Sequence, residues 1–253
     1  MPDRRAGVNQ RRELVLETVQ AGTSHVGDLA RRVGVSERTI RRDLLSLSQQ
    51  GRLERVHGGA VDADGAEGSL EATDPAAEKK ARIGAAAAKL AVDGQTLTLD
   101  NGTTTLEIAR NLKGRDVTVV TTNLRVYEEL RQDPTVELVL SGGIVSAGSE
   151  SMNGVIAEDS IRQLGSDVAF VATNAIEPDL SIWESAIDEV PLKRAIIDSA
   201  DRVVVVADSE KFRFSGSALI CYAPDVDDIV TDREITKADR IALSESDVKA
   251  TFA

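Results

Sequence analysis

The first residues with a clear chemical capacity are hydroxyl and guanidinium side chains in one short stretch: Ser36, Arg38, Thr39, Arg41 and Arg42. A guanidinium group can donate two parallel hydrogen bonds to the edge of a guanine base or to a phosphate. Serine and threonine hydroxyls can also donate to phosphate oxygens. If one surface holds these five side chains together, that surface can bind nucleic acid.

The apolar residues of the same stretch predict a helix that would hold these side chains together. Ile40, Leu44 and Leu47 recur at intervals of three or four residues, which places them on one face of a helix. The arginines then point away from that face. Ser36 is the expected N-cap, because its hydroxyl can accept a hydrogen bond from a free backbone N–H group. Two further helices are expected before this one, at residues 9–21 and 26–33.

A pair of strands is expected directly after this helix. Residues 52–55 and the residues from 61 onward can form the strands, and glycines between them permit a tight turn. Such a unit is a helix-turn-helix with a wing, and it places its recognition helix in the major groove of DNA. Arg55 and His57 would lie on the wing and contact phosphate or the minor groove. For His57, a turn residue that packs on the domain is an equally good interpretation.

A second group of polar residues follows the strands of a predicted α/β domain. Short β-rich runs alternate with helical stretches, which indicates a largely parallel sheet with helices on its faces. The strands are expected at residues 96–99, 117–121, 136–140, 168–171, 203–207, 218–222 and 228–231, and helices at 104–111, 124–131, 157–164 and 190–199. Sheets of this kind bind ligands outside the carboxyl ends of their strands. Polar residues at those ends should therefore meet in one crevice.

The residues expected to line this crevice are polar side chains and glycines: Asp100, Gly102, Thr103, Thr104, Thr105, Thr122, Asn123, Gly142, Gly143, Asp208 and Lys211. Gly102 and the threonines after it lead into a predicted helix, whose N-terminus offers free N–H groups and a positive dipole to a phosphate. Lys211 is a candidate second contact for an anion or a sugar hydroxyl. Asp100 and Asn123 suit the hydroxyls of a polyol, although capping and turn roles explain the same residue types.

Charge divides the chain into two parts. Its 253 residues are 42% hydrophobic, which suffices for packed cores. Residues 1–60 hold 11 arginines and seven acidic residues, whereas the whole chain has a net charge of -12. A basic end on an acidic body is typical of nucleic-acid binding confined to that end. We expect a DNA-binding domain at residues 1–61, an exposed linker at 62–76 and a ligand-binding domain at 77–253.

Rare residue types exclude several function classes. Both histidines lie in the first 60 residues, so the larger domain cannot hold a catalytic Ser-His-Asp group or most zinc sites. We expect no catalytic residue, no metal and no cofactor. The single cysteine, Cys221, fits a reducing compartment. Neither a secretory segment nor a run of about 18 apolar residues is evident, so we expect a cytoplasmic protein that does not cross a membrane.

Both parts of the chain resemble the DeoR family of bacterial regulators. In the first part the resemblance rests on Val35-Ser36, on Thr39-Ile40-Arg41-Arg42-Asp43-Leu44 and on Arg55-x-His57-Gly58-Gly59-Ala60. In the second part it rests on Leu99-Asp100-x-Gly102-Thr103-Thr104-Thr105, Thr122-Asn123, Gly142-Gly143, Gly154, Asp167-x-x-Phe170, Glu189-Val190-x-x-Lys193-Arg194, Ala207-Asp208-Ser209-x-Lys211-Phe212 and Thr231-Asp232. Together these motifs extend over residues 9–232.

This resemblance implies a winged helix-turn-helix domain and an α/β sensor domain similar in fold to ribose-5-phosphate isomerase. It implies a DNA-binding transcriptional regulator, usually a repressor of a carbohydrate or polyol operon. A phosphorylated sugar or sugar alcohol would release the protein from double-stranded operator DNA. The resemblance also adds Glu189 to the expected effector contacts. A homo-oligomer, either dimer or tetramer, is expected because two-fold assemblies bind inverted half-sites.

Two alternatives follow from the same residues. A sugar-phosphate isomerase or deaminase with an appended DNA-binding domain would use Asp100 or Glu189 as a base and Lys211 as an electrophile. Similarity of fold does not carry activity, however, and no pair of carboxylates has a spacing that supports such a reaction. The second alternative is an activator instead of a repressor, and sequence alone does not separate the two.

Overall fold

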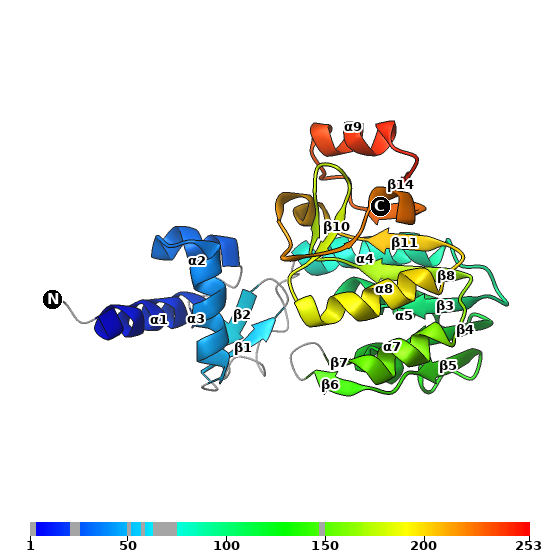
Figure 1. Cartoon of the computed structure of the whole chain (residues 1–253), viewed down its shortest axis with the longest axis horizontal. Helices are drawn as coiled ribbons and strands as arrows, with labels where there is room; N and C mark the ends of the chain where they lie inside the picture. Colours follow the sequence, from blue (N-terminus) through cyan, green and yellow to red (C-terminus); the bar gives the residue numbers. More distant parts are fainter. Residues whose placement is uncertain (1–3, 21–25, 50–51, 57–58, 63–74, 147–149) are drawn as a thin grey trace. The chain divides into compact units, whose positions relative to one another are not determined.

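The computed structural model of the chain (Figure 1) describes residues 4–20, 26–49, 52–56, 59–62, 75–146 and 150–253. The chain forms two compact units, Met1–Ala72 and Thr73–Ala253. Each unit has a hydrophobic core of its own.

Three helices and a pair of strands form the N-terminal unit: α1 (Arg4–Gln20), α2 (Val26–Val33), α3 (Glu37–Gln49), β1 (Leu53–Val56) and β2 (Gly59–Asp62). The two strands pair antiparallel, as expected for a wing. Ile40, Leu44 and Leu47 are at most 1% exposed, and they pack with apolar residues of α1 and α2. Gly34 follows α2 with a φ of 75°, a conformation that favours glycine, and so permits the sharp turn into α3.

A seven-stranded parallel sheet forms the centre of the C-terminal unit. Its strands are β3 (Thr96–Leu99), β4 (Val117–Thr121), β5 (Val136–Leu140), β8 (Val168–Ala172), β11 (Val203–Val206), β13 (Asp228–Thr231) and β14 (Lys249–Phe252). Their spatial order is β14-β13-β11-β8-β3-β4-β5, and every neighbouring pair is parallel. In chain order, β3, β4 and β5 extend the sheet toward one edge. The next strand, β8, lies on the other side of β3, and β11, β13 and β14 extend the sheet toward the opposite edge. The predicted α/β class is confirmed.

Helices cover both faces of this sheet (Figure 1). They are α4 (Pro75–Ala88), α5 (Thr103–Leu112), α6 (Leu124–Leu130), α7 (Val155–Arg162), α8 (Val190–Asp198) and α9 (Lys237–Glu245). Side chains alternate along a strand, so Phe170 of β8 packs with α4 and α5, whereas Ala169 and Val171 pack with α7 and α8. Burial on both faces is the physical reason for continuous apolar strands such as the four valines of β11.

The structure departs from the expected strands in the wing, in several short strands that were not expected, and in the main sheet. In the wing, β2 begins at Gly59, two residues before the expected start, so this glycine belongs to the strand. The strand expected at residues 218–222 is β12 (Ala218–Cys221), but it belongs to a separate antiparallel sheet with β10 (Ile182–Glu184) and β9 (Ala175–Ile176). The seventh strand of the main sheet is β14, a short edge strand whose half-buried side chains form no clear apolar pattern. Which sheet a strand joins depends on pairing partners that are distant in the chain, and the hydrophobic pattern within the strand does not identify them.

Shorter elements lie at the carboxyl end of the sheet and beside it. They are the hairpin of β6 (Ile144–Ser146) and β7 (Ser151–Asn153), and the 3-10 turns η1 (Ile187–Glu189), η2 (Ser209–Arg213) and η3 (Ala223–Asp225). Around the expected linker, β2 ends at Asp62 and α4 begins at Pro75. Residues 63–74 of that linker lie outside the described part of the chain.

Candidate DNA-binding helix and ligand-binding crevice

Helix α3 carries the expected nucleic-acid contacts. Its N-terminus is capped as predicted, because the backbone N–H of Thr39 donates to Ser36 Oγ at 3.3 Å and the two hydroxyl oxygens lie 2.9 Å apart. The side chain of Arg42 is exposed. The side chains of Arg38 and Arg41 on α3, and of Arg55 on β1, lie outside the described part of the structure, as does the whole of His57.

Asp43 supports α3 from its buried side. It is 1% exposed, and its carboxylate accepts hydrogen bonds from Arg11 at 2.6 and 3.0 Å and from Arg12 at 3.2 Å. The hydrogen bond to Asp43 raises the pKa of Arg11. These bonds fix α3 against α1, so they set the orientation of the helix face that carries Arg42. Asp43 was not among the residues predicted to have a role, although it lies on the apolar face of α3 three residues after Ile40.

The ligand site was expected at the carboxyl end of the sheet, where the strand order reverses. β3 and β8 are neighbours there, and open α/β sheets bind ligands at such a switch point. Asp100 follows β3 and is 1% exposed. Its Oδ2 accepts a hydrogen bond of 3.0 Å from the backbone N–H of Ala172, the last residue of β8. Asp100 therefore ties the two central strands together at the carboxyl end of the sheet.

A buried lysine completes this link. Lys193 of α8 donates to Asp100 Oδ2 at 2.5 Å and to the carbonyl oxygen of Ala172 at 2.9 Å, and its Nζ lies 3.6 Å from Glu184 Oε2. Lys193, Asp100 and Glu184 are each at most 2% exposed. Burial opposes the charge of Lys193, but Asp100, Glu184 and Glu189 together raise its pKa, so the ammonium stays charged.

Sequence reasoning missed two members of this network, Lys193 and Glu184. A signal for Lys193 was available, because it lies three residues from Val190 and from Ile196 on the apolar stripe of its helix. A lysine in that position is buried and needs a carboxylate partner. No comparable pattern in the sequence predicts that Glu184 is buried. It lies on β10, a short strand of the separate sheet β12-β10-β9.

The loop between β3 and α5 is the expected phosphate cradle. Gly102 is the residue before α5 and has a φ of 155°. A Cβ atom at Gly102 would lie 2.8 Å from the Cβ of Ala172. The hydroxyl of Thr105 lies 2.7 Å from the carbonyl oxygen of Asp100 and 2.8 Å from that of Gly102. Thr105 thus bonds to the loop itself, and Thr104 is buried. Gly102 and Thr103 are the half-exposed members of the loop at this helix N-terminus.

Substitution of Gly102 by alanine should raise the dissociation constant of a phosphorylated effector by at least about tenfold, or about 1.4 kcal/mol. The added methyl group must displace either the loop or Ala172, which moves the N–H groups of α5 from the phosphate position. Calorimetric titration of the full chain measures the effect. Gly165→Ala is the matched control, because nothing lies within 4 Å of a Cβ there. Equal affinities in both variants would remove the loop from the binding site.

Residues after β4 support the same loop. Asn123 Oδ1 accepts hydrogen bonds from the backbone N–H groups of Arg125 and Val126, at 2.9 and 3.4 Å, and so caps α6. Its Nδ2 donates to the carbonyl oxygen of Gly102 at 3.3 Å. The capping role considered for Asn123 is therefore present, and its amide also braces the loop. Thr122 is buried, and among the described residues its hydroxyl has no hydrogen-bond partner.

The two glycines after β5 lie at the edge of the sheet. β5 is two strands from β3, so Gly142 and Gly143 are about 10 Å from the central loop. A Cβ on Gly143 would lie 2.9 Å from the carbonyl oxygen of Asn153, and its φ is 152°. Position 143 needs a glycine because the backbone packs closely against β7 there. Gly142 is exposed.

Asp208 and Lys211 lie on the other side of the centre, after β11. Asp208 accepts a hydrogen bond of 3.0 Å from the backbone N–H of Glu210 and caps η2. Lys211 is half-buried, and in the described part of the chain its ammonium has neither a hydrogen bond nor an ion pair. Burial lowers the pKa of Lys211, Asp208 opposes this, and nearby Lys80 lowers the pKa further. An unpaired cation at this edge is suited to bind an anion.

The first turn of α4 is attached to the same edge. Lys79 donates to Ser209 Oγ at 3.4 Å and forms an ion pair of 2.7 Å with Glu234. Glu189, half-buried after β10, accepts a hydrogen bond of 3.4 Å from Asn101 Nδ2. The predicted residues thus form three groups: the central loop with Asp100 and Glu189, the edge with Asp208 and Lys211, and the separate glycines after β5.

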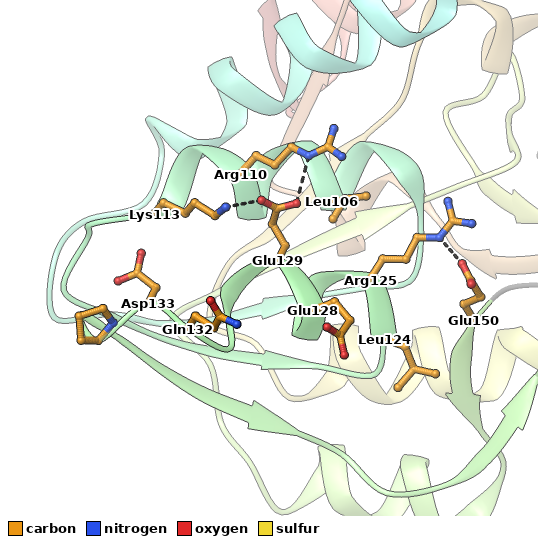
Figure 2. Close-up of a pocket in the computed structure, with 11 residues that line it drawn as sticks. Leu106, Arg110, Lys113, Leu124, Arg125, Glu128, Glu129, Gln132, Asp133 and Glu150 are labelled. Carbon is orange, nitrogen blue, oxygen red and sulfur yellow. Dashed lines mark hydrogen bonds and ion pairs between the residues drawn. The ribbon is translucent and has the colours of Figure 1, made fainter. Parts of the chain in front are cut away.

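A hollow of about 800 Å³ lies between α5 and α6 (Figure 2). Its charged side chains are largely paired with one another. Glu129 bonds to Arg110 at 3.3 Å and to Lys113, and Arg125 pairs with Glu150. None of the predicted effector contacts lines it. Across the described residues, no cluster of three potential ligands could hold a metal ion, and no helix could span a membrane.

Comparisons with known proteins agree with this division into two functional parts. Residues 76–233 match the DeoR C terminal sensor domain, and residues 11–65 match the DeoR-like helix-turn-helix domain. The transcriptional repressor AccR of Agrobacterium fabrum is 35% identical over 82% of this chain and 82% of its own length. The HTH-type transcriptional regulator GolR of Listeria innocua is 32% identical over 84% of this chain and 85% of its own.

Among solved structures, ribose 5-phosphate isomerase A from Methanocaldococcus jannaschii is similar to 53% of this chain, over 53% of its own, with 18% identity and a TM-score of 0.39. The family and these relatives are regulators, so the enzyme alternative is not favoured. The chain belongs to the DeoR family and is a DNA-binding transcriptional regulator.

Proposed function

We propose that this regulator represses a carbohydrate or polyol catabolism operon and leaves its operator when a phosphorylated sugar or sugar alcohol binds the crevice. The observation that carries the proposal is that two phosphate-binding groups lie at the same end of the sheet. One is the N-terminus of α5, at the switch point, and the other is Lys211 after β11, a half-buried lysine with no ion pair among the described residues. The N–H groups of α5 and the ammonium of Lys211 are both suited to a phosphate. β3 and β11 are two strands apart, or about 10 Å, so a compact ligand can reach both edges.

The remaining crevice residues suit the hydroxyl groups of such a ligand. Glu189 is half-buried and offers carboxylate oxygens, and Asn101 offers an amide beside it. Asp100 is 1% exposed, so in this proposal it holds Ala172 and Lys193 in place. Thr104, Thr105, Thr122 and Asn123 are buried, so in this proposal they position the loop while Gly102 and Thr103 contact the ligand. Asp208 similarly positions the turn that carries Lys211.

At the other end of the chain, the proposed operator contacts are the hydroxyl and guanidinium groups of α3 with Arg55 and His57 of the wing. A two-fold dimer or tetramer would place two copies of α3 in successive major grooves of double-stranded DNA. We place the DNA-binding domain at residues 1–61, the linker at 62–76 and the sensor at 77–253. We also place the protein in the cytoplasm, which suits its single cysteine and its proposed binding to operator DNA.

Activation is the second candidate. The L-fucose operon activator of Haemophilus influenzae is 30% identical to this chain over 90% of its length, whereas AccR is named a repressor. In vitro transcription from the bound promoter separates the two, because a repressor lowers transcript yield and an activator raises it. The physical requirement is the same for both: the effector must bind the DNA-competent and DNA-incompetent states with different affinity.

The proposal is tested by fluorescence anisotropy with DNA from upstream of the protein's own gene. We expect tight binding that one member of a panel of sugar and polyol phosphates abolishes at micromolar to low millimolar concentration. The unphosphorylated form of that compound should have no effect. Tight DNA binding that no phosphorylated compound changes would contradict the sensor role while leaving the DNA-binding role intact.

A further inference from the structure

A cluster of exposed apolar side chains lies beside the glycines that follow β5. Nine large apolar side chains are exposed among the described residues, and four of them lie between residues 144 and 156: Ile144, Val145, Val155 and Ile156. The first two lie on β6, and the other two begin α7 (Figure 1). Each is more than half exposed. Exposed aliphatic side chains are common singly, but a cluster of them marks an interaction site.

Glycines hold β6 and the start of α7 close together. A Cβ atom on Gly142 would lie 3.5 Å from Cγ2 of Ile156, and one on Gly154 would lie 3.5 Å from Cδ1 of Ile144. Each isoleucine therefore packs beside a glycine of the other segment. With the first residue of α7 they form one surface, which we call the aliphatic patch: Ile144, Val155 and Ile156. Side chains alternate along a strand, so Val145 points to the other face of β6.

The edge of the main sheet extends this patch. β5 is the last strand at its edge, so the N–H and C=O groups on its outer side pair with no other strand of the described chain. Its apolar side chains near the patch are only half-buried: Leu138, Val139 and Leu140. An uncovered apolar edge is a template for pairing with a further strand. Two copies of one edge strand can pair antiparallel about a two-fold axis, which makes such an edge complementary to itself.

Charge indicates what covers the patch. The chain has a net charge of -12 although its first 60 residues are basic, so the excess negative charge lies on the rest. Residues 142–146 and 151–157, in contrast, include no charged residue. Two acidic units repel each other unless their contact is uncharged. A nucleic acid or an anionic membrane would instead need basic side chains at its binding surface. A second copy of this chain is therefore the partner that fits.

We propose that the aliphatic patch and the outer edge of β5 form the interface between two copies of this chain. A standard interface removes about 800 Å² from each partner, a little more than half of it apolar. The three patch residues and Val145 expose roughly 300 Å² of apolar surface, which suits the apolar centre of such an interface. This inference rests on the two-copy arrangement in the proposed function and names the surface that holds the copies together.

The substitution Val155→Glu tests this interface by sedimentation of the full chain over a wide range of concentrations. The unmodified chain should sediment as a dimer or tetramer. Val155 is the first residue of α7, where an acidic side chain favours the helix, so the variant should fold. Association would remove two added carboxylates from water, so the dissociation constant should rise at least about tenfold.

Val92→Glu is the matched control for this substitution. Val92 is 62% exposed and Val155 is 66% exposed, but Val92 precedes β3 at the amino end of the sheet, whereas the patch follows the carboxyl end of β5. The same charge is therefore added at a similar depth and away from the patch. Association of Val92→Glu should equal that of the unmodified chain.

Thiol reactivity locates the interface directly. Cys221, the single cysteine of the chain, is buried, so Ile144→Cys introduces an exposed thiol into a chain that has no other. Its alkylation should slow as the protein concentration rises above the dissociation constant, because association buries position 144. Val92→Cys is the control, and its rate should not depend on protein concentration.

The outcomes separate this inference from the proposed function. If Val155→Glu associates as tightly as the unmodified chain, or if the thiol at position 144 reacts at one rate at every concentration, a different surface holds the copies together and the inference is overturned. If the unmodified chain stays a monomer throughout, the two-copy arrangement is overturned as well. The sensor role is judged by its own titrations in either case.

Discussion

Replacement of Lys193 by methionine should destabilise the C-terminal unit by about 3–5 kcal/mol at pH 7, the range for removal of one partner from a buried ion pair. Methionine retains the length and apolar contacts of the lysine stem but leaves Asp100 and Glu184 buried without their cation. The backbone carbonyl of Ala172 also loses its donor. Because this network ties β3, β8 and α8 together, the loss should affect the unit as a whole.

The loss of stability caused by Lys193→Met should become smaller as the pH falls. Lys193 has a raised pKa, so its contribution is fully present at neutral pH and is lost only in strong alkali. In the variant, buried carboxylates without a cation have raised pKa values. The folded variant then binds more protons than its unfolded chain, and its stability increases from pH 7 toward pH 5 relative to that of the unmodified protein.

Urea unfolding followed by Trp183 fluorescence measures this effect. Trp183 is the only tryptophan of the chain and lies on β10, next to Glu184, so it reports on the C-terminal unit alone. Lys113→Met is the matched control, since Lys113 is 49% exposed in its ion pair with Glu129 and should cost less than about 1 kcal/mol. If the urea midpoint of Lys193→Met equals that of Lys113→Met within error, the buried network does not support the fold.

Replacement of Arg41 or Arg42 by alanine should weaken operator binding by about 1–3 kcal/mol, or about 5- to 150-fold, for each guanidinium that contacts a base. If the arginine contacts phosphate instead, affinity should fall for all DNA sequences and the salt dependence should become less steep, by about one unit of slope per contact. The exposed position of Arg42 on α3, opposite Ile40 and Leu44, is the structural reason for expecting a direct contact.

Anisotropy titrations over a series of salt concentrations distinguish the two kinds of contact. Operator and unrelated DNA are compared for each variant, and helical content is checked by circular dichroism. Arg131→Ala is the control, because Arg131 lies in the C-terminal unit in an exposed ion pair with Glu128. Unchanged affinity in both Arg41→Ala and Arg42→Ala would refute the assignment of α3 as the recognition helix.

Local patterns in the sequence predicted much of this architecture. Ile40, Leu44 and Leu47 have helical spacing, and their burial in the structure confirms the orientation of α3. The strands at residues 96–99, 117–121, 136–140 and 228–231 have the bounds that their apolar runs predict. These elements are predictable because burial on one or two faces leaves a periodic trace within a few residues. The polar residues after the strands likewise predicted a ligand site at the carboxyl end of the sheet, and that site stays a prediction.

Only the tertiary structure decided which residues meet in that crevice. Lys193 and Asp100 are 93 residues apart in the chain, and the sequence contains no trace of their contact. Thr105 and Asn123 support the loop instead of facing outward, because their bonds go to the backbone of Asp100 and Gly102. The tertiary structure also decided that β14, and not β12, is the seventh strand of the main sheet. Sequence determines each element through its own periodicity, whereas partners across the sheet depend on long-range packing, which only the folded chain brings together.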